Sequence, residues 1–498
     1  TGPLGQGCAM SVGMAMAQKH LGATLAKPLF DYHVWTLMGD GCYQEDITYA
    51  AASLAGHLKL NNLIWYYDRN ARQISGEIER TISDDVGLVY RGLGWKVIEI
   101  DGHDHTQIEK AITQAKTNTK SPTLIVGLTT MAKGSHSMEG NHDSHGVPFS
   151  KDEQARTKAL LDVPAGESFY WPDSTSTFFQ QNFVKKSAQV KNWYETKTRL
   201  SEKDPTFKTK FKAHYDEAID LTHLSKQNWD KDLATRQAFG LVLKSWAQEV
   251  PRIFGGSADL EPSNMTQDFA DLVKDFQANY PLGRNVAYGV REFPMAAISN
   301  GIALHGGLLP FDATFLSFSD YSRPALRLGA LQKLGVIHEF THDSIYLGED
   351  GPTHQPIEHL MSLRAMPGLY VMRPADSKET EVLMQYTLNL KAPSAICLSR
   401  QKVVALERID SSFSGQEQAK RGAWIVKRAL HLKAVIYATG SEVQLALLVA
   451  KELEQTDPSL ANSIQVVSVP CWELFFEQDK AYQEEILVDH CQARISIE

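Results

Sequence analysis

The sequence predicts an α/β protein of consecutive domains with mainly parallel, doubly wound sheets, and three observations predict it. Short apolar runs alternate with helical patterns along most of the chain, which is typical of strands joined by crossover helices. The chain has 498 residues, and at roughly 150 residues per domain this length suits about three domains. Charged, polar stretches near residues 150–232 and 410–420 separate three such series.

The first series defines a predicted domain over residues 1–199, which includes a helical connection. TGPLGQG is a Pro/Gly turn that opens an Ala- and Met-rich helix ending near Gly22. The backbone N–H groups of this turn, at Gly2 and Leu4 among them, are suited to face a phosphate. We expect strands at residues 33–38, 63–68, 95–100 and 123–130, and helices at 47–58 and 105–116. The Lys-rich stretch 150–232 is expected to be a helical surface connection.

Two further series follow. Residues 200–409 are predicted to form a second domain with the same alternation of strands and helices as the first. It runs from the helical pattern LATRQAFGLVLKSWAQEV to the apolar run SAICLSR. Residues 410–498 are predicted to form a third, shorter α/β domain, in which the runs KAVIYA and IQVVSVP flank a helix. The chain opens inside a turn and ends inside an apparent strand, so we expect it to be truncated at both ends.

The composition limits the classes of function. The chain carries 50 Lys and Arg against 59 Asp and Glu, a net charge of −9, which argues against nucleic acid or an anionic membrane as a partner. No run approaches the ~18 apolar residues of a membrane span, and no export signal is recognisable, so we expect a cytoplasmic protein. The cysteines are scattered without a CxxC pair, which indicates a reducing compartment and no structural zinc; they are Cys8, Cys42, Cys397, Cys471 and Cys491.

Two strand ends in the first series bring oxygen ligands together. Asp40, flanked by Gly39 and Gly41, follows one apolar run. Asn70 follows the next run, at 70 − 40 = 30 residues beyond. Adjacent parallel strands place their carboxyl ends in one crevice, and oxygen donors from Asp40, Asn70 and the backbone near Arg72 suit Mg2+ or Ca2+. The glycines admit a bulky anion, so we interpret the crevice as a diphosphate clamp, although a GDG tripeptide alone is more often only a turn.

The spacing GDG, about 30 residues, then N, looks like the thiamine-diphosphate signature. The chain resembles the transketolase family over its whole length, in the segments GDGCYQE, SLAGHL and DRN and, downstream, in THDS and GEDGPTHQP. The resemblance implies a homodimer that uses thiamine diphosphate and Mg2+ (or Ca2+). It would move a two-carbon glycolaldehyde unit from a ketose phosphate, such as xylulose 5-phosphate, to an aldose phosphate, such as ribose 5-phosphate or erythrose 4-phosphate, in the pentose phosphate pathway.

Two alternatives stay open. One is a sibling enzyme with the same cofactor, such as dihydroxyacetone synthase or deoxyxylulose-phosphate synthase; the segment THDSIYLGEDGPTHQP weighs against the latter. The other is a noncatalytic remnant that retains the fold as a binding or structural module. The presence of every matched site residue disfavours this second alternative.

An acid in the second series is a candidate catalytic group. YGVREFP places Glu292 after an apparent strand and just inside a helix, as an exposed acid whose other possible role is to compensate the helix dipole. The resemblance implies that Glu292 bonds N1′ of the cofactor's aminopyrimidine and takes part in its proton transfer. It also implies that Glu45 meets Glu292 across a subunit interface, and that Met131 and Asp259 contact the cofactor.

Aromatic residues recur near the middle of the second series. Phe315, Phe318 and Tyr321 stand at three-residue spacing, which lines one face of a helix or tight turn. Such stripes are usually core. The resemblance assigns these three rings to the pocket for the aminopyrimidine, which flat apolar walls would hold by stacking.

Histidine-rich segments supply candidate substrate ligands. HEFTHDSIYLGEDGPTHQPIEHL is the densest polar segment of the chain, and the first-domain loop KGSHSMEGNHDSHGVPF carries His136, His142 and His145. A metal site of three loop histidines is disfavoured because no i, i+4 helical pair with a Glu accompanies them, so contacts to phosphate or to a ring nitrogen are expected.

The transketolase resemblance assigns roles to these residues. It implies that His342 and Asp350 contact the sugar hydroxyls, and that His354 and His145 lie near the reacting carbons. It further implies a clamp for the terminal phosphate of the substrate, built from two guanidinium groups and a hydroxyl, which is suitable chemistry for a dianion. The clamp consists of Arg236, Ser263 and Arg400.

Four features depart from the family pattern. Arg72 stands where the family usually carries an apolar residue, and Asp46 replaces the usual Gly after Glu45. Pro294 ends an uncommon REFP, and Tyr346 stands where Gly is typical. We expect these changes to bear on the substrate channel, and a charge at residue 72 is unexpected beside a thiazolium. The family's N-terminal segment, with histidines that complete the site, is expected to lie outside this sequence.

Overall fold

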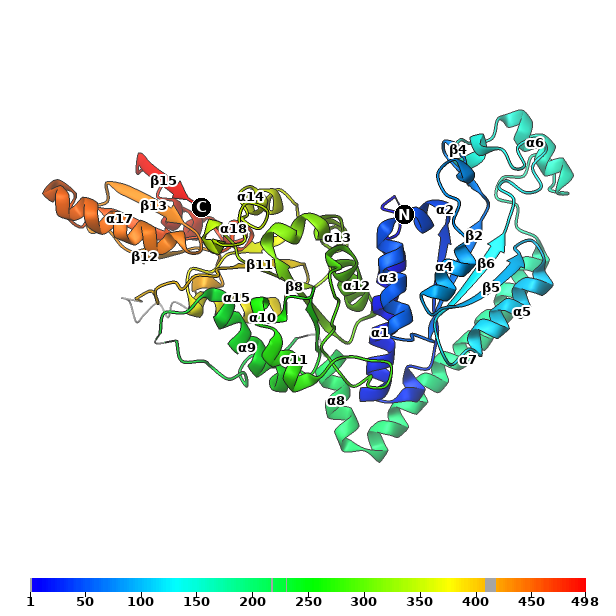
Figure 1. The fold of residues 1–498 in the computed structure, drawn as a ribbon, viewed down its shortest axis with the longest axis horizontal. Coiled ribbons are helices and arrows are strands. Elements are labelled where there is room, and N and C mark those ends of the chain that lie inside the picture. The colour runs from blue at the N-terminus through cyan, green and yellow to red at the C-terminus, as the bar shows by residue number, and fades with distance from the viewer. Residues whose placement is uncertain (1, 216–217, 230, 408–417) are drawn as a thin grey trace. The chain divides into compact units, whose positions relative to one another are not determined.

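The computed structural model describes residues 2–215, 218–229, 231–407 and 418–498. The chain forms two compact units, Thr1–Lys212 and Ala213–Glu498, which are described separately below. Figure 1 shows that strands and helices alternate along both units. The predicted domain limits near residues 199 and 409 stay predictions. The second limit, and most of the polar stretch 410–420, lies outside the described residues.

Unit 1 is built on a four-stranded parallel sheet of order β1-β2-β6-β5. Its strands are β1 (Val34–Gly39), β2 (Leu63–Arg69), β5 (Lys96–Asp101) and β6 (Thr123–Leu128). Its first helices are α1 (Gln6–Thr24), α2 (Asp40–Gln44), α3 (Asp46–His57), α4 (Val86–Gly92) and α5 (His105–Lys116). All four strands expected from the apolar runs are therefore confirmed, as are the expected helices.

Local sequence explains where several of these elements begin. Asp104 caps α5, because its carboxylate accepts hydrogen bonds from the N–H groups of Thr106 and Gln107. Helix α1 is buried along most of its length, which its small residues Ala and Gly permit. It packs against α3 and β1, so the predicted opening turn is held on the body of unit 1.

Short elements complete unit 1. A two-stranded hairpin of β3 (Arg72–Gln73) and β4 (Gly76–Glu77) follows β2. Three 3₁₀ helices are η1 (Lys27–Leu29), η2 (Ile78–Arg80) and η3 (His142–His145). The predicted helical connection consists of α6 (Lys151–Leu160), α7 (Asp173–Lys203) and α8 (Pro205–Tyr215), and the surfaces of α6 and α7 are largely exposed.

Unit 2 contains a five-stranded parallel sheet of order β10-β11-β9-β8-β7. Its strands are β7 (Ile253–Ser257), β8 (Leu309–Phe315), β9 (Ile337–Thr341), β10 (Tyr370–Met372) and β11 (Ser394–Leu398). Helices α9 (Thr235–Glu249) and α15 (Ser377–Thr387) pack together over this sheet. The helices α10 (Glu261–Asn264), α11 (Gln267–Val273), α12 (Glu292–His305), α13 (Ser319–Leu331) and α14 (His359–Arg364), with η4 (Leu316–Phe318) and η5 (Ile345–Leu347), lie between its strands in the chain.

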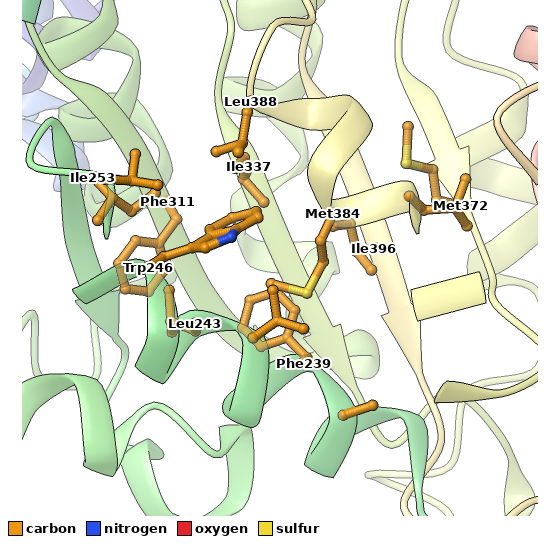
Figure 2. Close-up of a cluster of buried hydrophobic side chains, with 14 of the residues drawn as sticks. Phe239, Leu243, Trp246, Ile253, Phe311, Ile337, Met372, Met384, Leu388 and Ile396 are labelled. Atoms are coloured by element: carbon orange, nitrogen blue, oxygen red, sulfur yellow. The ribbon is translucent and has the colours of Figure 1, made fainter. Parts of the chain in front are cut away.

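The hydrophobic core of this sheet lies beneath α9 and α15. Figure 2 shows Phe239, Leu243 and Trp246 of α9 directed toward side chains of the strands. The apolar residues of α9 recur at three- and four-residue spacing, so they form one buried face of the helix. This burial fixes the helix whose first turn carries Arg236.

A second sheet in unit 2 has the order β12-β14-β13-β15, in which β12 runs antiparallel to β14. Its strands are β12 (Trp424–Lys427), β13 (Ala434–Ala438), β14 (Ile464–Ser468) and β15 (Ala493–Ile497), and its helices are α17 (Glu442–Thr456), η6 (Pro458–Leu460), α18 (Trp472–Phe476) and α19 (Lys480–Leu487). The predicted third α/β series is thus confirmed in β13, α17 and β14. Within the described residues, no helix has the length and apolarity to cross a membrane.

Phe239→Ala should destabilise the protein by about 3–5 kcal/mol, because it removes a ring that is 1% exposed and leaves a cavity. The urea concentration at half-unfolding, followed by circular dichroism, measures the effect. Leu241→Ala on the same helix is the matched control, since Leu241 is 39% exposed and its truncation should cost less than about 0.5 kcal/mol. Equal shifts in the two variants would contradict the assignment of this core.

Candidate active site

The ends of β1 and β2 bring the predicted metal ligands of unit 1 together. Asp40 begins α2 directly after β1, and Asn70 directly follows β2. The backbone N–H of Arg72 donates to Asp40 Oδ2 at 3.3 Å and to Asn70 Oδ1 at 3.0 Å. The hydroxyl of Tyr67 donates to Asp40 Oδ1 at 2.5 Å. Two oxygens from strand ends 30 residues apart in sequence therefore lie around one donor.

This arrangement fits a hard divalent cation. Asp40 is 3% exposed, and burial raises the pKa of its carboxyl, while hydrogen bonds from Tyr67 and the Arg72 backbone lower it. The Asp40 and Asn70 oxygens share a single backbone N–H, so both retain lone pairs for a further partner. Carboxylate and amide oxygens are ligands that Mg2+ and Ca2+ take. Among the described residues, no group of three His, Cys, Asp or Glu side chains is placed to hold a metal ion, so this site would depend on the amide and on backbone oxygen.

Glycines let the opening turn of the chain approach this crevice closely. A Cβ atom on Gly41 would lie 2.8 Å from Cδ1 of Leu4. Gly5 has a φ of 76°, and a Cβ there would lie 2.8 Å from Cβ of Glu45. Leu4, Gly41 and Glu45 thus lie close together around the turn. Gly2 is exposed, and a Cβ on Gly39 would meet open space.

The side chain of Arg72 does not extend freely from this turn. Its Nε donates to the carbonyl of Gly140 at 3.0 Å, and its Nη1 donates to the carbonyl of Ala71 at 3.1 Å. Gly140 belongs to the loop between Met131 and His145, and its N–H donates to the Met131 carbonyl at 2.8 Å. Met131 is partly buried, whereas His145 is exposed in η3. The Arg72 guanidinium is therefore partnered by two backbone carbonyls and by the carboxylate of Glu77, 3.5 Å from Nη2.

In unit 2, two expectations for Glu292 are wrong. Glu292 is the first residue of α12, as predicted, but the segment before it is irregular and forms no strand. The acid is also buried, at 9% exposure, where an exposed side chain was expected. The apolar residues of NVAYGV suggest a strand, yet this segment forms only two isolated bridges, from Asn285 to Gly255 and to Asp275. Burial raises the pKa of the Glu292 carboxyl.

The predicted aromatic residues form a cluster with two of the predicted histidines. Phe315 at the end of β8 stacks on Phe318, with ring centroids 5.7 Å apart and planes 13° apart. The His342 ring lies 4.0 Å from Phe315, and the His354 ring lies 5.2 Å from Phe318. The Tyr321 ring belongs to the same cluster, because its centroid lies 6.3 Å from that of Phe318, and its side chain is 64% exposed. These flat walls surround the end of the strand and suit a planar ligand.

His342 is held in an unusual conformation just after β9. Its φ is 64°, in the left-handed region, and its Nδ1 lies 3.0 Å from Oγ1 of Thr341. Burial lowers the pKa of His342 to about 3, and the charges of Arg236, Arg400 and then His354 contribute in the same direction. The imidazole is therefore neutral at physiological pH. His354 repeats part of this pattern, because its Nδ1 lies 2.9 Å from Oγ1 of Thr353.

The residues predicted to clamp the phosphate all lie in unit 2. Arg236 Nη1 donates to the backbone carbonyl of Ser263 at 2.8 Å, and Arg236 Nε is buried without a hydrogen-bond partner in the described part of the chain. Arg400 is one-third exposed and forms a short ion pair with Glu349. Burial lowers the pKa of Arg236, and the positive charge of Arg400 contributes in the same direction. Asp259 and Asp350 both lie in exposed loops.

Asn264 is a site residue that the sequence analysis missed. Its Nδ2 donates to the Thr314 carbonyl at 3.1 Å and to Thr341 Oγ1 at 2.8 Å, while its Oδ1 accepts from Ser257 Oγ at 2.7 Å. It therefore ties the carboxyl ends of β7, β8 and β9 together and supports the threonine that bonds His342. Hydrophobic periodicity does not identify such a residue, and its position directly after Ser263 was the only indication in the sequence that it lies near the site.

The other departures from the family pattern lie at the starts of two helices and in an exposed 3₁₀ helix. Asp46 is the first residue of α3, where a carboxylate suits the positive end of the helix dipole. Pro294 occupies the first turn of α12, where its missing N–H costs no helical hydrogen bond. Tyr346 lies in η5 and is 64% exposed.

Comparison with known proteins decides the family. Residues 1–219 match the "Transketolase, thiamine diphosphate binding domain", residues 231–404 the "Transketolase, pyrimidine binding domain", and residues 422–498 the "Transketolase-like TK C-terminal domain". The chain belongs to the transketolase family. The matches confirm the predicted transketolase resemblance, its α/β fold and its class as a thiamine-diphosphate-dependent enzyme.

Individual transketolases are similar over nearly the whole chain. The transketolase of Halalkalibacterium halodurans is 40% identical over 519 residues, covering 100% of this chain and 75% of the relative. The crystal structure of the Campylobacter jejuni transketolase matches with a TM-score of 0.90 at 39% identity, covering 100% of this chain and 78% of that one. A Pichia stipitis transketolase complex with sedoheptulose 7-phosphate matches with a TM-score of 0.92 at 36% identity, covering 98% of this chain and 72% of that one.

His342→Asn should make stability less dependent on pH, because Asn tolerates the left-handed conformation and does not titrate. The unfolded wild-type chain takes up a proton below pH ~6.5, whereas folded His342 resists protonation down to about 3. The wild type should therefore lose about 1.4 kcal/mol per pH unit, relative to the variant, as pH falls from ~6.5. Urea unfolding of both proteins between pH 7.5 and about 5 measures this. Parallel pH profiles would show that His342 is not held neutral.

Proposed function

We propose that the chain catalyses the transketolase reaction, the transfer of a two-carbon glycolaldehyde unit from a ketose phosphate to an aldose phosphate. The observation that carries the proposal is the grouping of stacked rings, threonine-bonded histidines and two arginines at the strand ends of unit 2. Such a group offers a flat apolar wall, neutral hydrogen-bonding groups for hydroxyls, and cations for a phosphate. The Pichia stipitis relative described with sedoheptulose 7-phosphate supports a sugar phosphate as the substrate.

Unit 1 would hold the diphosphate end of the cofactor. Asp40, Asn70 and the backbone at Arg72 would bind Mg2+ (or Ca2+), and the turn around Leu4 and Gly41 would admit the diphosphate. When bound, thiamine diphosphate supplies the electron sink that bond cleavage beside a ketose carbonyl requires. We assign the contacts of Gly2, Gly39, Glu45, Met131 and Asp259 to the same cofactor.

Glu292 and the aromatic cluster would hold the aminopyrimidine. Burial raises the pKa of the Glu292 carboxyl and so favours its protonated form, which suits Glu292 to hold a proton at N1′ of the ring. Phe315, Phe318 and Tyr321 would provide the walls of its pocket. The helix dipole of α12 lowers the pKa of the Glu292 carboxyl, whereas burial raises it. The pKa therefore depends on which groups cover the Glu292 side chain.

The histidines would orient the sugar. His342 is neutral and its Nδ1 is engaged by Thr341, so Nε2 is the atom that would meet a substrate hydroxyl. His354 would use the same atom, because its Nδ1 is engaged by Thr353. Asp350 would bind a further hydroxyl, and His145 on its exposed loop in unit 1 would act near the reacting carbons.

The arginines would hold the far end of the substrate. Arg236 presents a buried Nε without a hydrogen-bond partner in the described residues, and Arg400 presents a partly exposed guanidinium. Together with Ser263 they would bind a terminal phosphate. The ion pair of Arg400 with Glu349 keeps that guanidinium oriented, and an incoming phosphate would compete with Glu349 for it.

Three broader features belong to the proposal. The enzyme would work as a homodimer, as the family resemblance implies, within the pentose phosphate pathway. It would be cytoplasmic, a reducing location in keeping with its five free cysteines. Its domains would divide near residues 199 and 409.

Asp40→Ala should abolish metal-dependent binding of thiamine diphosphate, because one of two side-chain ligands is lost and the charge of the diphosphate is left uncompensated. Fluorescence titration of the chain with thiamine diphosphate, with and without Mg2+, measures this. Asp68→Ala is the matched control, since Asp68 lies at the end of the neighbouring strand and bonds Thr129. A metal-dependent affinity equal to that of the wild type would refute the clamp.

Arg400→Ala should lower kcat/KM for xylulose 5-phosphate by roughly 10- to 100-fold, because a charge-assisted hydrogen bond to the phosphate is lost. Hydroxypyruvate carries no phosphate, so its kcat/KM should change little. Both donors are measured with glycolaldehyde as the acceptor, which keeps phosphate out of the second half-reaction.

Lys244→Ala is the control for a general loss of positive charge, since Lys244 pairs with Asp268 on the surface of the same unit. Equal losses on both donors in Arg400→Ala would mean that Arg400 only braces the site. Failure of the wild type to form any ketose product from either donor would overturn the proposed reaction itself.

A further inference from the structure

The geometry points to Arg72 as a positioning residue that joins the metal-ligand turn of unit 1 to the loop 131–146. This inference deepens the proposed function, because it concerns the residues assigned to the cofactor. The family resemblance left this arginine unexplained. Its two ends, however, contact the two segments of unit 1 that carry the candidate ligands.

The backbone of Arg72 contacts the candidate metal ligands. Its N–H is the donor shared by Asp40 Oδ2 and Asn70 Oδ1, at 3.3 and 3.0 Å. A cation bound by these oxygens would share them with the Arg72 N–H. The position of the Arg72 backbone is therefore linked directly to whether the ligand pair is occupied.

The guanidinium of Arg72 contacts the loop. Nε donates to the Gly140 carbonyl at 3.0 Å, and the N–H of Gly140 closes the loop onto the Met131 carbonyl at 2.8 Å. The strand β3, which begins at Arg72, also packs against η3, where His145 lies. The arginine thus holds the residue at which the loop closes, between its candidate cofactor contact and its candidate catalytic histidine.

Two further groups contact the guanidinium. Nη1 donates to the Ala71 carbonyl at 3.1 Å, and Nη2 lies 3.5 Å from Glu77 Oε1 across the β3–β4 hairpin. A planar guanidinium with five N–H donors can serve two carbonyls and a carboxylate at once, whereas an apolar side chain can serve none of them. The side chain is 27% exposed, so water competes only partly for these bonds.

The consequence is a mechanical link within one residue. Because the backbone of Arg72 follows the metal ligands and its guanidinium holds Gly140, binding of Mg2+ and thiamine diphosphate would also order the loop that carries His145. The departure from an apolar residue thereby gains a function. It makes the position of a candidate catalytic loop respond to occupancy of the cofactor site.

Hydrogen–deuterium exchange of the full chain tests this link. In the wild type, Mg2+ with thiamine diphosphate should slow amide exchange across residues 131–146. In Arg72→Met, exchange of the ligand-free loop should be roughly 10-fold faster, and adding Mg2+ and thiamine diphosphate should not restore protection. The affinity for thiamine diphosphate should stay within about threefold of wild type, because the backbone donor remains, while kcat falls.

Two variants sharpen the result. Glu77→Gln removes only the ion pair across the hairpin and should exchange and turn over like the wild type. Arg72→Lys retains the charge but not the forked geometry of the guanidinium, so its loop exchange and its kcat should lie between those of the wild type and of Arg72→Met. This second variant keeps the test valid if Arg72→Met misfolds. Wild-type loop exchange and kcat in both Arg72 variants would overturn the inference.

The outcome can be separated from failure of the proposed function. If Asp40→Ala retains metal-dependent cofactor binding, the clamp is wrong, yet faster exchange of the ligand-free loop in Arg72→Met would still show that Arg72 holds it. If the clamp is right but the loop of the wild type shows no response to Mg2+ and thiamine diphosphate, the coupling alone is wrong.

Discussion

Parallel strand pairing is the constraint that positions the candidate site residues of unit 1 and, separately, those of unit 2. Gly39 pairs with Asp68 at the ends of β1 and β2, and Phe315 pairs with Thr341 at the ends of β8 and β9. The next residues along each strand must then emerge at the same edge of the sheet. Backbone hydrogen bonds in the sheets therefore decide which polar side chains meet, and the helices only set how far apart in sequence those side chains stand.

The elements themselves were largely predictable because their signals are local. Apolar runs and helical periodicity located all four strands of the first sheet. The errors arose where local pattern and tertiary context disagree. The run before Glu292 is apolar enough for a strand, but it makes only isolated bridges, at Asn285, within the described residues and is partly exposed. The antiparallel strand β12 was not predicted, because its four residues and irregular register carry little periodic signal.

The candidate site was predictable as far as motifs reach. In unit 1 the spacing of Asp40 and Asn70 is visible in the sequence, and both side chains accept from the Arg72 N–H. In unit 2 two residues of the histidine-rich segment, His342 and His354, lie against the predicted aromatic rings. Asn264 and the partners of Arg72 could not be predicted, because each depends on carbonyl and hydroxyl groups contributed by segments distant in sequence. A hydrogen bond to backbone is independent of the partner's side chain, so it leaves no pattern in the residues that accept it.

The electrostatics of unit 2 reconcile features that first look incompatible. Arg236 and Arg400 place positive charge beside His342, which a histidine binding a sugar hydroxyl tolerates only if it stays neutral. Burial and those same charges ensure that neutrality, since each disfavours the imidazolium. At Glu292 burial acts on an acid, so it favours the neutral form there as well. One property, exclusion of water at the ends of buried strands, thus favours the neutral form of both His342 and Glu292, and it leaves Arg236 and Arg400 to attract a phosphate.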